Sequence, residues 1–399
     1  MKNDLPLKIK EFNANRNQAV LPLKYAAMAE SAFSFFRGTC HIFYQDLLKK
    51  YPLPTSPLTW ICGDLHLENF GSYKGQNHLL YFDMNDFDEA ILAPLLLELT
   101  RLLVSVEIKT AEIKLSKKER DAIRVQLINA YRTTLIKNKA QNIEKEIAKG
   151  LIKKLIDKVD QRNPDSLLIN RTTNKASNAK LIITDKLLVI KPTEKKQLIT
   201  AFTTWFSTAH FKGYRITDAG FRIAGTGSIG IKRYLFLLEK KDNPQQKKLI
   251  DVKQAFPSCL LNYKKMQQPV WKNEAERIVS TQEMMQHVSP AFLSTFSYKK
   301  DWYVVKQIQP TSDKICIEKT AKQNDLISNY VKDLGIITAS AQLRSSGRYK
   351  SATADELKVF AEDDSWVKVV TEWSIKYAEQ VKKDYADFYM AWEKDYFKN

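Results

Sequence analysis

The sequence predicts an α+β fold with two lobes, a larger helical lobe and a small antiparallel β lobe. Apolar residues recur at helical spacing over residues 22–50, 117–158 and 323–398. Residues 214–256 instead alternate apolar and polar side chains on either side of the turn DNPQQ, which is typical of hairpins. With 399 residues, 44% of them hydrophobic, the chain is long enough to bury a sizeable core.

Two short strands that end in polar residues follow the first helical block. LTWICGD (58–64) and HLLYFDMND (78–86) read as strands because each is an apolar run that leads into Asp or Asn. Pro94 suits the first turn of a helix that runs to about Thr110. The polar residues therefore lie in the loops that connect these elements.

The remaining elements form the β-rich unit and a second helical block. LIITDKLLVIKP (181–192) fits a strand or hairpin, residues 271–288 fit a helix, and DWYVVKQIQP (301–310) fits another strand. The later Trp, Tyr and Phe residues recur at helical spacing and are expected in the core. We expect three parts: a helical part at 1–212, a β-rich unit at 213–310 and a second helical part at 311–399.

Composition argues against several classes of protein. The net charge of +18 could favour an anionic partner, but acids are interleaved with the basic residues and no nucleic-acid-binding motif accompanies them. No run of about eighteen apolar residues exists, so no membrane span is expected. The polar N-terminus is unlike a signal peptide, and the four cysteines lack metal-ligand spacing. We expect a cytoplasmic protein with free thiols.

The stretch 61–89, ICGDLHLENFGSYKGQNHLLYFDMNDFDE, concentrates residues that suit phosphate chemistry. Asp64, Asn69 and Asp83 can supply a base for an attacking hydroxyl and ligands for magnesium beside a phosphate. Buried carboxylates cost free energy unless they are paired or metal-bound, so a structural core does not explain them. Asp86 and Asp88 are alternative ligands for the same metal.

Other interpretations of this stretch remain open. Asp and Asn side chains also cap ordinary polar loops. Asp64-x-His66 would suit one metal of a two-metal phosphoesterase, but the other histidines of the chain form no DxH or HxH pair. No G-x-S-x-G element supports a serine hydrolase.

A glycine-rich segment in the β-rich unit is a candidate phosphate loop. Gly225, Gly227, Ser228 and Gly230 form a GxGxxG pattern that is followed by the β-prone IKRYLFLLE. A dinucleotide-binding fold would place a helix there, whereas strand–loop–strand is the arrangement that covers ATP phosphates in protein kinases. An ordinary glycine-rich hairpin turn is the alternative.

Lys253 lies in the short apolar strand LIDVKQAF, where an ammonium group needs a partner. In a kinase this lysine would contact the α- and β-phosphates and pair with a glutamate on a helix. Glu274, Glu276 and Glu283 of the next helix are candidates, and Glu276 is preferred. A lysine that extends its amine to solvent from an edge strand is the alternative.

Gly63-Asp64-Leu65-His66-x-x-Asn69 resembles the catalytic loop of the protein-kinase-like superfamily, in particular of the aminoglycoside and choline kinases. The usual form there is H-G-D-x-H-x-x-N, and Cys62 replaces the first His. The resemblance implies that Asp64 is the catalytic base and that Asn69 and Asp83 bind magnesium, with Asp86 as a further ligand.

The chain also resembles the bacterial DUF2252 family, a domain of unknown function placed with the kinase-like superfamily. The GDxHxxNFG and FDxNDFDE blocks carry the resemblance most specifically. The similar segments are 32–47, 61–73, 81–90, 222–239, 249–255, 276–286 and 302–310.

The order of these segments implies a circular permutation of a bilobal kinase-like fold. Kinases place the glycine loop and lysine before the catalytic loop, whereas here both follow it. The helices after Gln323 should then pack beside residues 22–50. WYVVKQIQP (302–310) would be the hinge, whose backbone could bind adenine.

These expectations describe an ATP- and Mg²⁺-dependent phosphotransferase that acts on a hydroxyl of a small molecule or a protein. Transfer of AMP by the same site, or a nucleotide-binding pseudokinase, is the alternative. Arg37 is expected to form a structural ion pair or to contact a phosphate or the substrate. The acceptor and the oligomeric state stay open.

Overall fold

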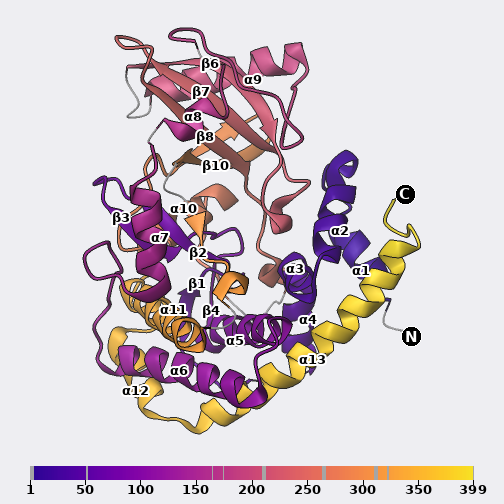
Figure 1. Cartoon of the computed structure of the whole chain (residues 1–399), viewed down its shortest axis with the longest axis vertical. Helices are drawn as coiled ribbons and strands as arrows, with labels where there is room; N and C mark the ends of the chain where they lie inside the picture. Colours follow the sequence, from indigo (N-terminus) through magenta and orange to yellow (C-terminus); the bar gives the residue numbers. More distant parts are fainter. Residues whose placement is uncertain are drawn as a thin grey trace.

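A helical lobe and a β-rich lobe lie one above the other in the computed structural model (Figure 1). The structure describes residues 4–50, 53–163, 165–173, 175–208, 213–262, 267–309, 313–320 and 323–398. The mixed α+β class predicted from the sequence is confirmed. The predicted ends of the β-rich unit adjoin residues 209–212 and 310–312, which lie outside the described residues, as does Pro310 of the expected hinge.

The β-rich lobe is built on one antiparallel sheet of six strands, in the order β5-β6-β7-β8-β10-β9. The hairpins expected within 214–256 are β6, β7 and β8. The strands are β5 (Leu187–Leu188), β6 (Tyr214–Arg222), β7 (Arg233–Lys240), β8 (Lys247–Gln254), β9 (Ser294–Tyr298) and β10 (Asp301–Ile308).

Apolar clusters cover both faces of this sheet. On one face Leu198, Phe202 and Phe206 of α9 (Pro192–Thr208) pack against strand residues such as Phe236. On the other face Leu181 and residues near α8 (Ser166–Ile169) pack against Leu237 and Leu249. The rest of this second face carries charged side chains such as Asp251 and Lys253, which share it with Leu249 because they alternate along β8.

Helix α10 (Glu274–Met285) connects the two lobes, because it contacts β9, β10 and helix α11. It begins at Asn273, whose side chain accepts a hydrogen bond from the Glu276 N–H as an N-cap. The helix expected within 271–288 is therefore confirmed.

The helical lobe packs its longest helices against one another. Helix α11 lies along α6, and α5 lies along α13. Capping boxes at Ser116–Glu119 and Thr353–Glu356 begin α6 and α12. The helices are α5 (Leu95–Glu112), α6 (Lys117–Ile136), α7 (Gly150–Asp160), α11 (Asn324–Arg344), α12 (Ala354–Glu362) and α13 (Ser365–Glu393).

Four N-terminal helices and two small sheets complete this lobe. The helices expected within 22–50 are three rather than one or two, and α13 packs beside α1, α2 and α3. The helices are α1 (Leu5–Phe12), α2 (Leu21–Ala29), α3 (Ala32–Gly38) and α4 (Cys40–Lys50). One small sheet pairs β1 (Leu58–Ile61) with β4 (Ile91–Pro94), and the other orders β11 (Asp313–Lys314), β2 (Phe70–Lys74) and β3 (Leu80–Met84).

Several elements were not predicted from the sequence. Strands β2, β4 and β9 are short, and their pairing partners are set by tertiary structure. Helix α9 forms although Thr and aromatic residues favour strands, because Leu198, Phe202 and Phe206 lie four residues apart and bury one helical face. Of the aromatic residues expected in the core of α13, Trp366, Trp373, Tyr377 and Phe388 are buried, whereas Tyr385, Tyr389 and Trp392 are only half-buried.

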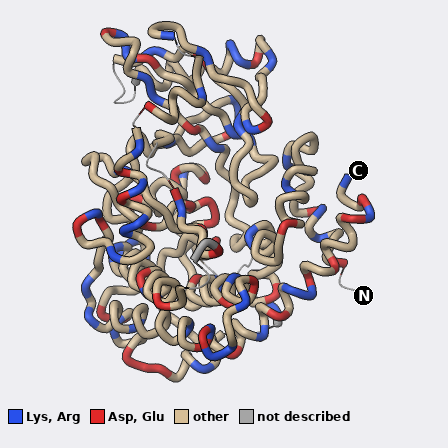
Figure 2. The backbone as a smooth tube through the Cα atoms, viewed as in Figure 1, with Lys and Arg blue, Asp and Glu red and all other residues tan. Residues whose placement is uncertain are grey.

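Charge is spread over both lobes, and acidic residues occur among the basic ones (Figure 2). In the described part of the chain, no helix combines the length and the apolarity that crossing a membrane would require. Cys40, Cys62, Cys259 and Cys316 are all free thiols.

Candidate active site

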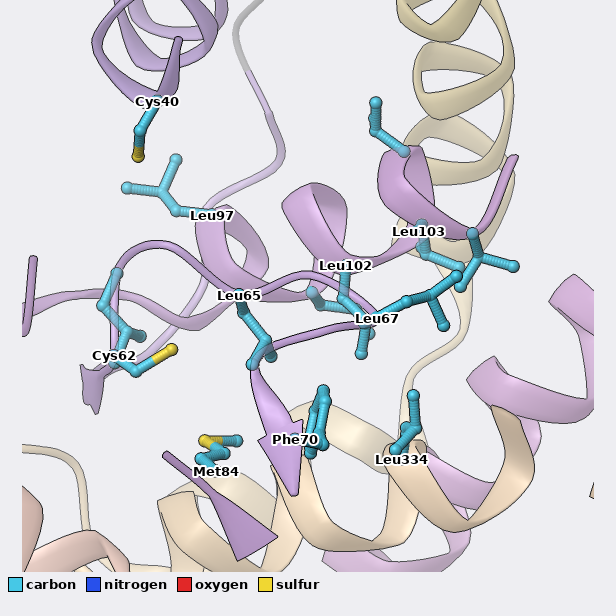
Figure 3. Packing of buried hydrophobic residues seen from close by; sticks show 14 of the residues in the cluster. Cys40, Cys62, Leu65, Leu67, Phe70, Met84, Leu97, Leu102, Leu103 and Leu334 are labelled. Carbon is cyan, nitrogen blue, oxygen red and sulfur yellow. The ribbon is translucent and has the colours of Figure 1, made fainter. Parts of the chain in front are cut away.

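The predicted catalytic loop is anchored by side chains that alternate with its polar residues. Leu65, Leu67 and Phe70 are buried among residues such as Met84 and Leu102 (Figure 3). Asp64 and Glu68 alternate with these leucines and line cavities instead. The apolar anchors therefore fix the direction of the polar side chains.

Contacts from α4, α5 and the backbone at Glu89 hold Asp64 and its neighbour Gly63. Gly63 adopts φ +82°, and a Cβ there would lie 2.2 Å from the Glu89 carbonyl oxygen. The Tyr44 hydroxyl donates to the Gly63 carbonyl, and Arg101 Nε donates to Asp64 Oδ1 over 2.8 Å. Within the described residues, Asp64 Oδ2 carries no hydrogen bond, so this oxygen is available to a ligand.

Arg101 is fully buried on α5 and was not recognised from the sequence as a site residue. Its guanidinium lies 4.2 Å from the centre of the Phe36 ring and 4.9 Å from that of Phe43. Burial lowers its pKa, but the Asp64 carboxylate together with Cys40 and Tyr44 raises the pKa overall. The signal available in the sequence was a charged residue inside the apolar run LLLELTRLLVSV.

Asn69 joins the catalytic loop to the acidic loop after β3. Its Nδ2 donates to the carbonyl oxygens of Asp64 and Asp86 over 3.1 Å each, and its Oδ1 accepts from the Asp86 N–H over 2.7 Å. Asn69 is 3% exposed and lines a cavity of about 500 Å³, called the larger cavity below, which lies beside this acidic loop. It therefore fixes the spacing of the two loops, and its role as a magnesium ligand stays a prediction.

Asp83 is buried within β3 and does not line any of the cavities around Asp64. Its Oδ1 accepts from the Met84 N–H over 2.8 Å, and its Oδ2 accepts from Arg344 Nη2 over 3.1 Å. Burial raises its pKa, although the Arg344 charge opposes this shift. The structure thus separates Asp83 from the other predicted metal ligands and joins it to α11.

Asp86 and Asp88 are the carboxylates that face Lys253. The Lys253 ammonium forms an ion pair with Asp88 and lies 3.7 Å from Asp86 Oδ1. Enclosure raises the pKa of Asp86, but the Lys253 and Lys306 charges outweigh it and lower that pKa. Burial and the neighbouring Asp86 raise the pKa of Asp88.

The predicted pairing of Lys253 with Glu276 is corrected by the structure. Glu276 Oε2 accepts a hydrogen bond from the Lys272 N–H at the start of α10 over 2.6 Å. A carboxylate is favourable at a helix N-terminus because it satisfies free N–H groups there. Glu276 therefore stabilises α10, and the acidic loop supplies the partners of Lys253.

The glycine-rich segment connects β6 to β7 through a short turn, η2 (Thr226–Ser228). The expected strand–loop–strand arrangement is confirmed. Gly225 has φ +76° and Gly230 has φ +92°, conformations that favour glycine. Gly225 and Ser228 line the larger cavity, so the loop closes one side of it.

Two cavities bring the predicted residues together. A cavity of about 500 Å³ is lined by Asn69, Asp86, Asp88, Gly225, Ser228 and Lys253, together with other polar residues. A cavity of about 170 Å³ is lined by Asp64, Asp86, Asp88, Gly227 and Ser228, among others. The two share Asp86, Asp88 and Ser228, whereas Asp83, Gly230 and Glu276 line neither.

The strands of the β-rich lobe line the larger cavity with charged residues that were not predicted from the sequence as site residues. Asp251 accepts hydrogen bonds from Arg222 over 2.7 Å and from Arg233 Nε over 2.8 Å. The Lys306 amine has no hydrogen bond or ion pair within the described residues, and burial lowers its pKa to about 8. Charges within apolar strands such as YVVKQI were the available signal.

Arg37 has the structural ion pair that was one of its two expected roles. Its Nη1 donates to Glu68 over 2.7 Å, and Lys314 from β11 pairs with the same carboxylate. Arg37 also lines both cavities, so it is available to a ligand there.

Asp86 and Asp88 are the residues that could contribute to a magnesium site completed by a phosphate ligand. In the described part of the chain, no group of three or more His, Cys, Asp or Glu side chains could by itself hold a metal. Mg²⁺ commonly uses one or two carboxylates together with waters and substrate phosphates. Asp86 and Asp88 supply that number of carboxylates at the shared part of the cavities.

Comparison with known proteins identifies the family of this chain. A family model described as uncharacterized proteins conserved in bacteria, DUF2252, matches residues 16–391. No curated protein and no solved structure matched the chain. The matched region contains the predicted catalytic loop, the acidic loop, the β-rich lobe and most of α13. The chain therefore belongs to the DUF2252 family.

Proposed function

We propose that this protein is an ATP- and Mg²⁺-dependent phosphotransferase that acts on a hydroxyl group. The observation that carries the proposal is the meeting of Asp64 with the glycine loop and Lys253 around two adjoining cavities. These groups are more than 150 residues apart in the sequence. Phosphoryl transfer uses a base, metal-binding carboxylates and a phosphate-binding loop close together, so this meeting supports the proposal.

Asp64 is the base in the proposed reaction. Its Oδ2 accepts the proton of the acceptor hydroxyl while the hydroxyl oxygen forms a bond to the γ-phosphorus. The bond between that phosphorus and the bridging oxygen breaks, and ADP leaves. Arg101 holds Asp64 Oδ1, so Oδ2 keeps a fixed direction during the proton transfer.

The phosphates are held by backbone and by cations. Lys253 and Lys306 lie in the larger cavity with Gly225 and Ser228, and they offer positive charge to the phosphate oxygens. Asp86 and Asp88 would hold magnesium, which neutralises phosphate charge when it is bound. Lys253 pairs with these same carboxylates.

We further propose a circularly permuted, kinase-like bilobal fold. The support is the order of the glycine loop and Lys253 after the catalytic loop, together with the packing of α13 beside α2 and α3. The free thiols fit a reducing compartment such as the cytoplasm.

The test is nucleotide binding and turnover with Mg²⁺ and a panel of hydroxyl-bearing metabolites. Asp64→Asn should keep nucleotide affinity within about threefold but lower turnover by about 10²-fold or more, because general base catalysis contributes that much. Asp86→Asn should weaken binding only when Mg²⁺ is present. Asp242→Asn, in the exposed β7–β8 turn, is the matched control.

The proposal fails if the wild-type protein binds no nucleotide with or without Mg²⁺. The mass added to the acceptor distinguishes phosphoryl transfer from AMP transfer. Binding without any turnover over the whole panel would favour the pseudokinase alternative.

A further inference from the structure

The glycine-rich loop is held by the N-terminal helices of the chain. Arg16 Nη1 donates to the Gly227 carbonyl oxygen over 2.6 Å and to that of Ile229 over 3.0 Å. Lys24 Nζ donates to the Gly227 carbonyl oxygen over 2.9 Å. The Asn17 N–H donates to the Gly230 carbonyl oxygen over 2.8 Å. A segment more than 200 residues earlier in the sequence thus binds four carbonyl groups of this loop, those of Thr226, Gly227, Ile229 and Gly230.

The side chains of Arg16 and Lys24 donate their hydrogen bonds to this loop. Lys24 is 1% exposed, and a buried amine is costly unless it donates hydrogen bonds. Neither residue pairs with a carboxylate within the described residues. The Lys24 amine donates to these carbonyl groups in either protonation state, because both states carry N–H donors. These contacts are therefore the reason for the burial of Lys24.

The contacts also determine where the loop directs its N–H groups. In a planar trans peptide the C=O of one residue and the N–H of the next point in opposite directions. Arg16 binds the Ile229 carbonyl, and Lys24 lies 3.4 Å from the Thr226 carbonyl oxygen. The N–H groups of Gly227 and Gly230 consequently point away from the N-terminal helices. Neither N–H has a hydrogen-bond partner within the described residues.

We propose that Arg16 and Lys24 are positioning residues that set the glycine loop for phosphate binding. They hold its carbonyl groups on the side of the N-terminal helices, which leaves the N–H of Gly227, a residue that lines the small cavity, for a nucleotide polyphosphate. The inference rests on the proposed function, because it assigns the ligand of the loop. It makes residues 16–24 part of the nucleotide site, with a loop that is ordered before the ligand arrives.

The small cavity gives this arrangement a direct connection to catalysis. Arg16, Lys24 and Gly227 line it together with Asp64 and Asp88. A loop displaced by about 1 Å would move its phosphate contacts relative to the base, which costs rate or affinity out of proportion to the movement. Since Arg16 and Lys24 do not touch the reacting atoms in this proposal, their loss should affect nucleotide affinity more than maximal turnover.

The experiment compares Arg16→Ala, Arg16→Lys, Lys24→Met and the control Lys10→Met. Lys10 lies on α1, with its ammonium 5.3 Å from the centre of the Tyr396 ring, and makes no contact with the glycine loop. Nucleotide Kd, KM and kcat are measured with Mg²⁺. Amide hydrogen exchange of residues 222–233 is measured without nucleotide. Circular dichroism verifies that each variant is folded.

The expected result is a Kd and KM for Mg–ATP raised about tenfold or more in Arg16→Ala and Lys24→Met, with kcat within about threefold. Arg16→Lys keeps one donor group and should recover part of the affinity, and Lys10→Met should resemble wild type. Exchange in residues 222–233 should be faster only in the loop variants. If Lys24→Met does not fold, the two Arg16 variants carry the comparison, because Arg16 is only half-buried.

Two results would overturn the inference, and they are distinguishable. If wild type binds nucleotide and Arg16→Ala binds it equally well, the positioning role is wrong while the proposed function stands. If wild type binds no nucleotide, the proposed function is wrong and the inference falls with it. A merely structural role would lower thermal stability without the separation of KM from kcat or the partial recovery by Arg16→Lys.

Discussion

At the scale of single residues, the site depends on groups that fix the direction of Asp64. Gly63 allows the backbone to pass within contact distance of the Glu89 carbonyl, and Arg101 binds one oxygen of the carboxylate. Both act on the residue that the proposed mechanism uses as its base. Substitutions at Gly63 or Arg101 should therefore change both the stability of the protein and the position of Asp64.

Gly63→Ala should destabilise the protein more than Gly213→Ala does. Both glycines have positive φ, +82° and +98°, so both changes carry the strain of a left-handed conformation. Only the Gly63 variant also places a Cβ against Glu89, 2.2 Å from its carbonyl oxygen, whereas nothing lies within 4 Å at Gly213. Overpacking of this kind typically costs about 1–3 kcal/mol. Urea denaturation measures the difference, and equal stabilities of the two variants would contradict it.

Glu98 should make stability fall as pH rises from about 5 to 8. This carboxyl is fully buried on α5, and burial raises its pKa to about 7 although Cys62 N–H and Gln342 donate to it. Because the folded pKa is above the unfolded one, near 4.3, the folded state binds more protons between these values. The stability contributed by protonation is complete below the unfolded pKa and is lost as pH rises through about 7.

The size of this effect follows from the pKa difference. A shift of this order corresponds to about 3–4 kcal/mol over the full window, since one pKa unit is about 1.4 kcal/mol. Glu98→Gln removes the titration but keeps a similar shape. The free energy of unfolding of wild type minus that of Glu98→Gln should therefore be larger at pH 5 than at pH 8. An unchanged difference would show that Glu98 does not titrate in this range.

At the scale of elements, α10 supports the acidic loop in a way that differs from the expected lysine–glutamate pair. Arg277 is 1% exposed and donates to the carbonyl oxygens of Asp88 over 3.0 Å, Phe256 over 2.8 Å and Ala90. The helix thus binds the backbone of the loop that carries Asp88. Glu276 binds the N-terminus of the helix, and Glu274 pairs with Arg277 itself.

Arg277→Met should weaken Mg-dependent nucleotide binding as well as stability. The change leaves three carbonyl groups without their donor, and each unsatisfied buried group costs about 1–3 kcal/mol. The acidic loop that carries Asp88 should then no longer be held in a fixed position. Calorimetric titration with Mg–ATP measures the affinity, and thermal denaturation measures the stability.

Arg132→Met is a matched control for this change. Arg132 also donates to carbonyl oxygens, those of Ala361 over 3.0 Å and Glu362 over 3.3 Å, but it does so at the end of α12. The Arg132→Met variant should be less stable than wild type and should keep the wild-type nucleotide affinity. If Arg277→Met kept the wild-type affinity as well, the supporting role of α10 would be refuted.

At the scale of the whole molecule, the arrangement of the chain ends suits the proposed permutation. Both termini lie on the same side of the helical lobe (Figure 1). Helix α1 packs against α13, and the Phe397 ring centroid lies 4.4 Å from that of Tyr25. Joining the ends and opening the chain before β6 would place β6 to β10 ahead of the predicted catalytic loop, as in an ordinary kinase, while β5 and α9 would come last.

A permutant that begins at residue 213 and joins the old termini through a flexible linker of about ten residues should fold and bind Mg–ATP. Its affinity should be within about threefold of wild type, because the cavity keeps the same lining. Circular dichroism and calorimetric titration measure folding and affinity. A control opened inside α5, between Leu102 and Leu103, should not fold, since both residues are fully buried. A permutant at 213 that fails to fold would contradict two separable lobes in this order.

The sequence by itself determined the β-hairpins, the glycine-rich loop and the position of the acidic stretch. These features depend on local patterns: the two-residue alternation of β6 to β8, positive φ at Gly225 and Gly230, and polar residues at strand ends. Helix α9 also had a local signal, in apolar residues four positions apart, but β-prone residues obscured it.

Only the tertiary structure decided which charged groups meet. Local spacing does not distinguish Asp83 from Asp86, and Arg344, from 261 residues away, is the partner that joins Asp83 to α11. In the same way Lys253 meets Asp86 and Asp88 rather than Glu276, and Arg16 reaches the glycine loop. Periodicity indicates which face of an element is buried, but the partner of a buried charge depends on which distant element packs there.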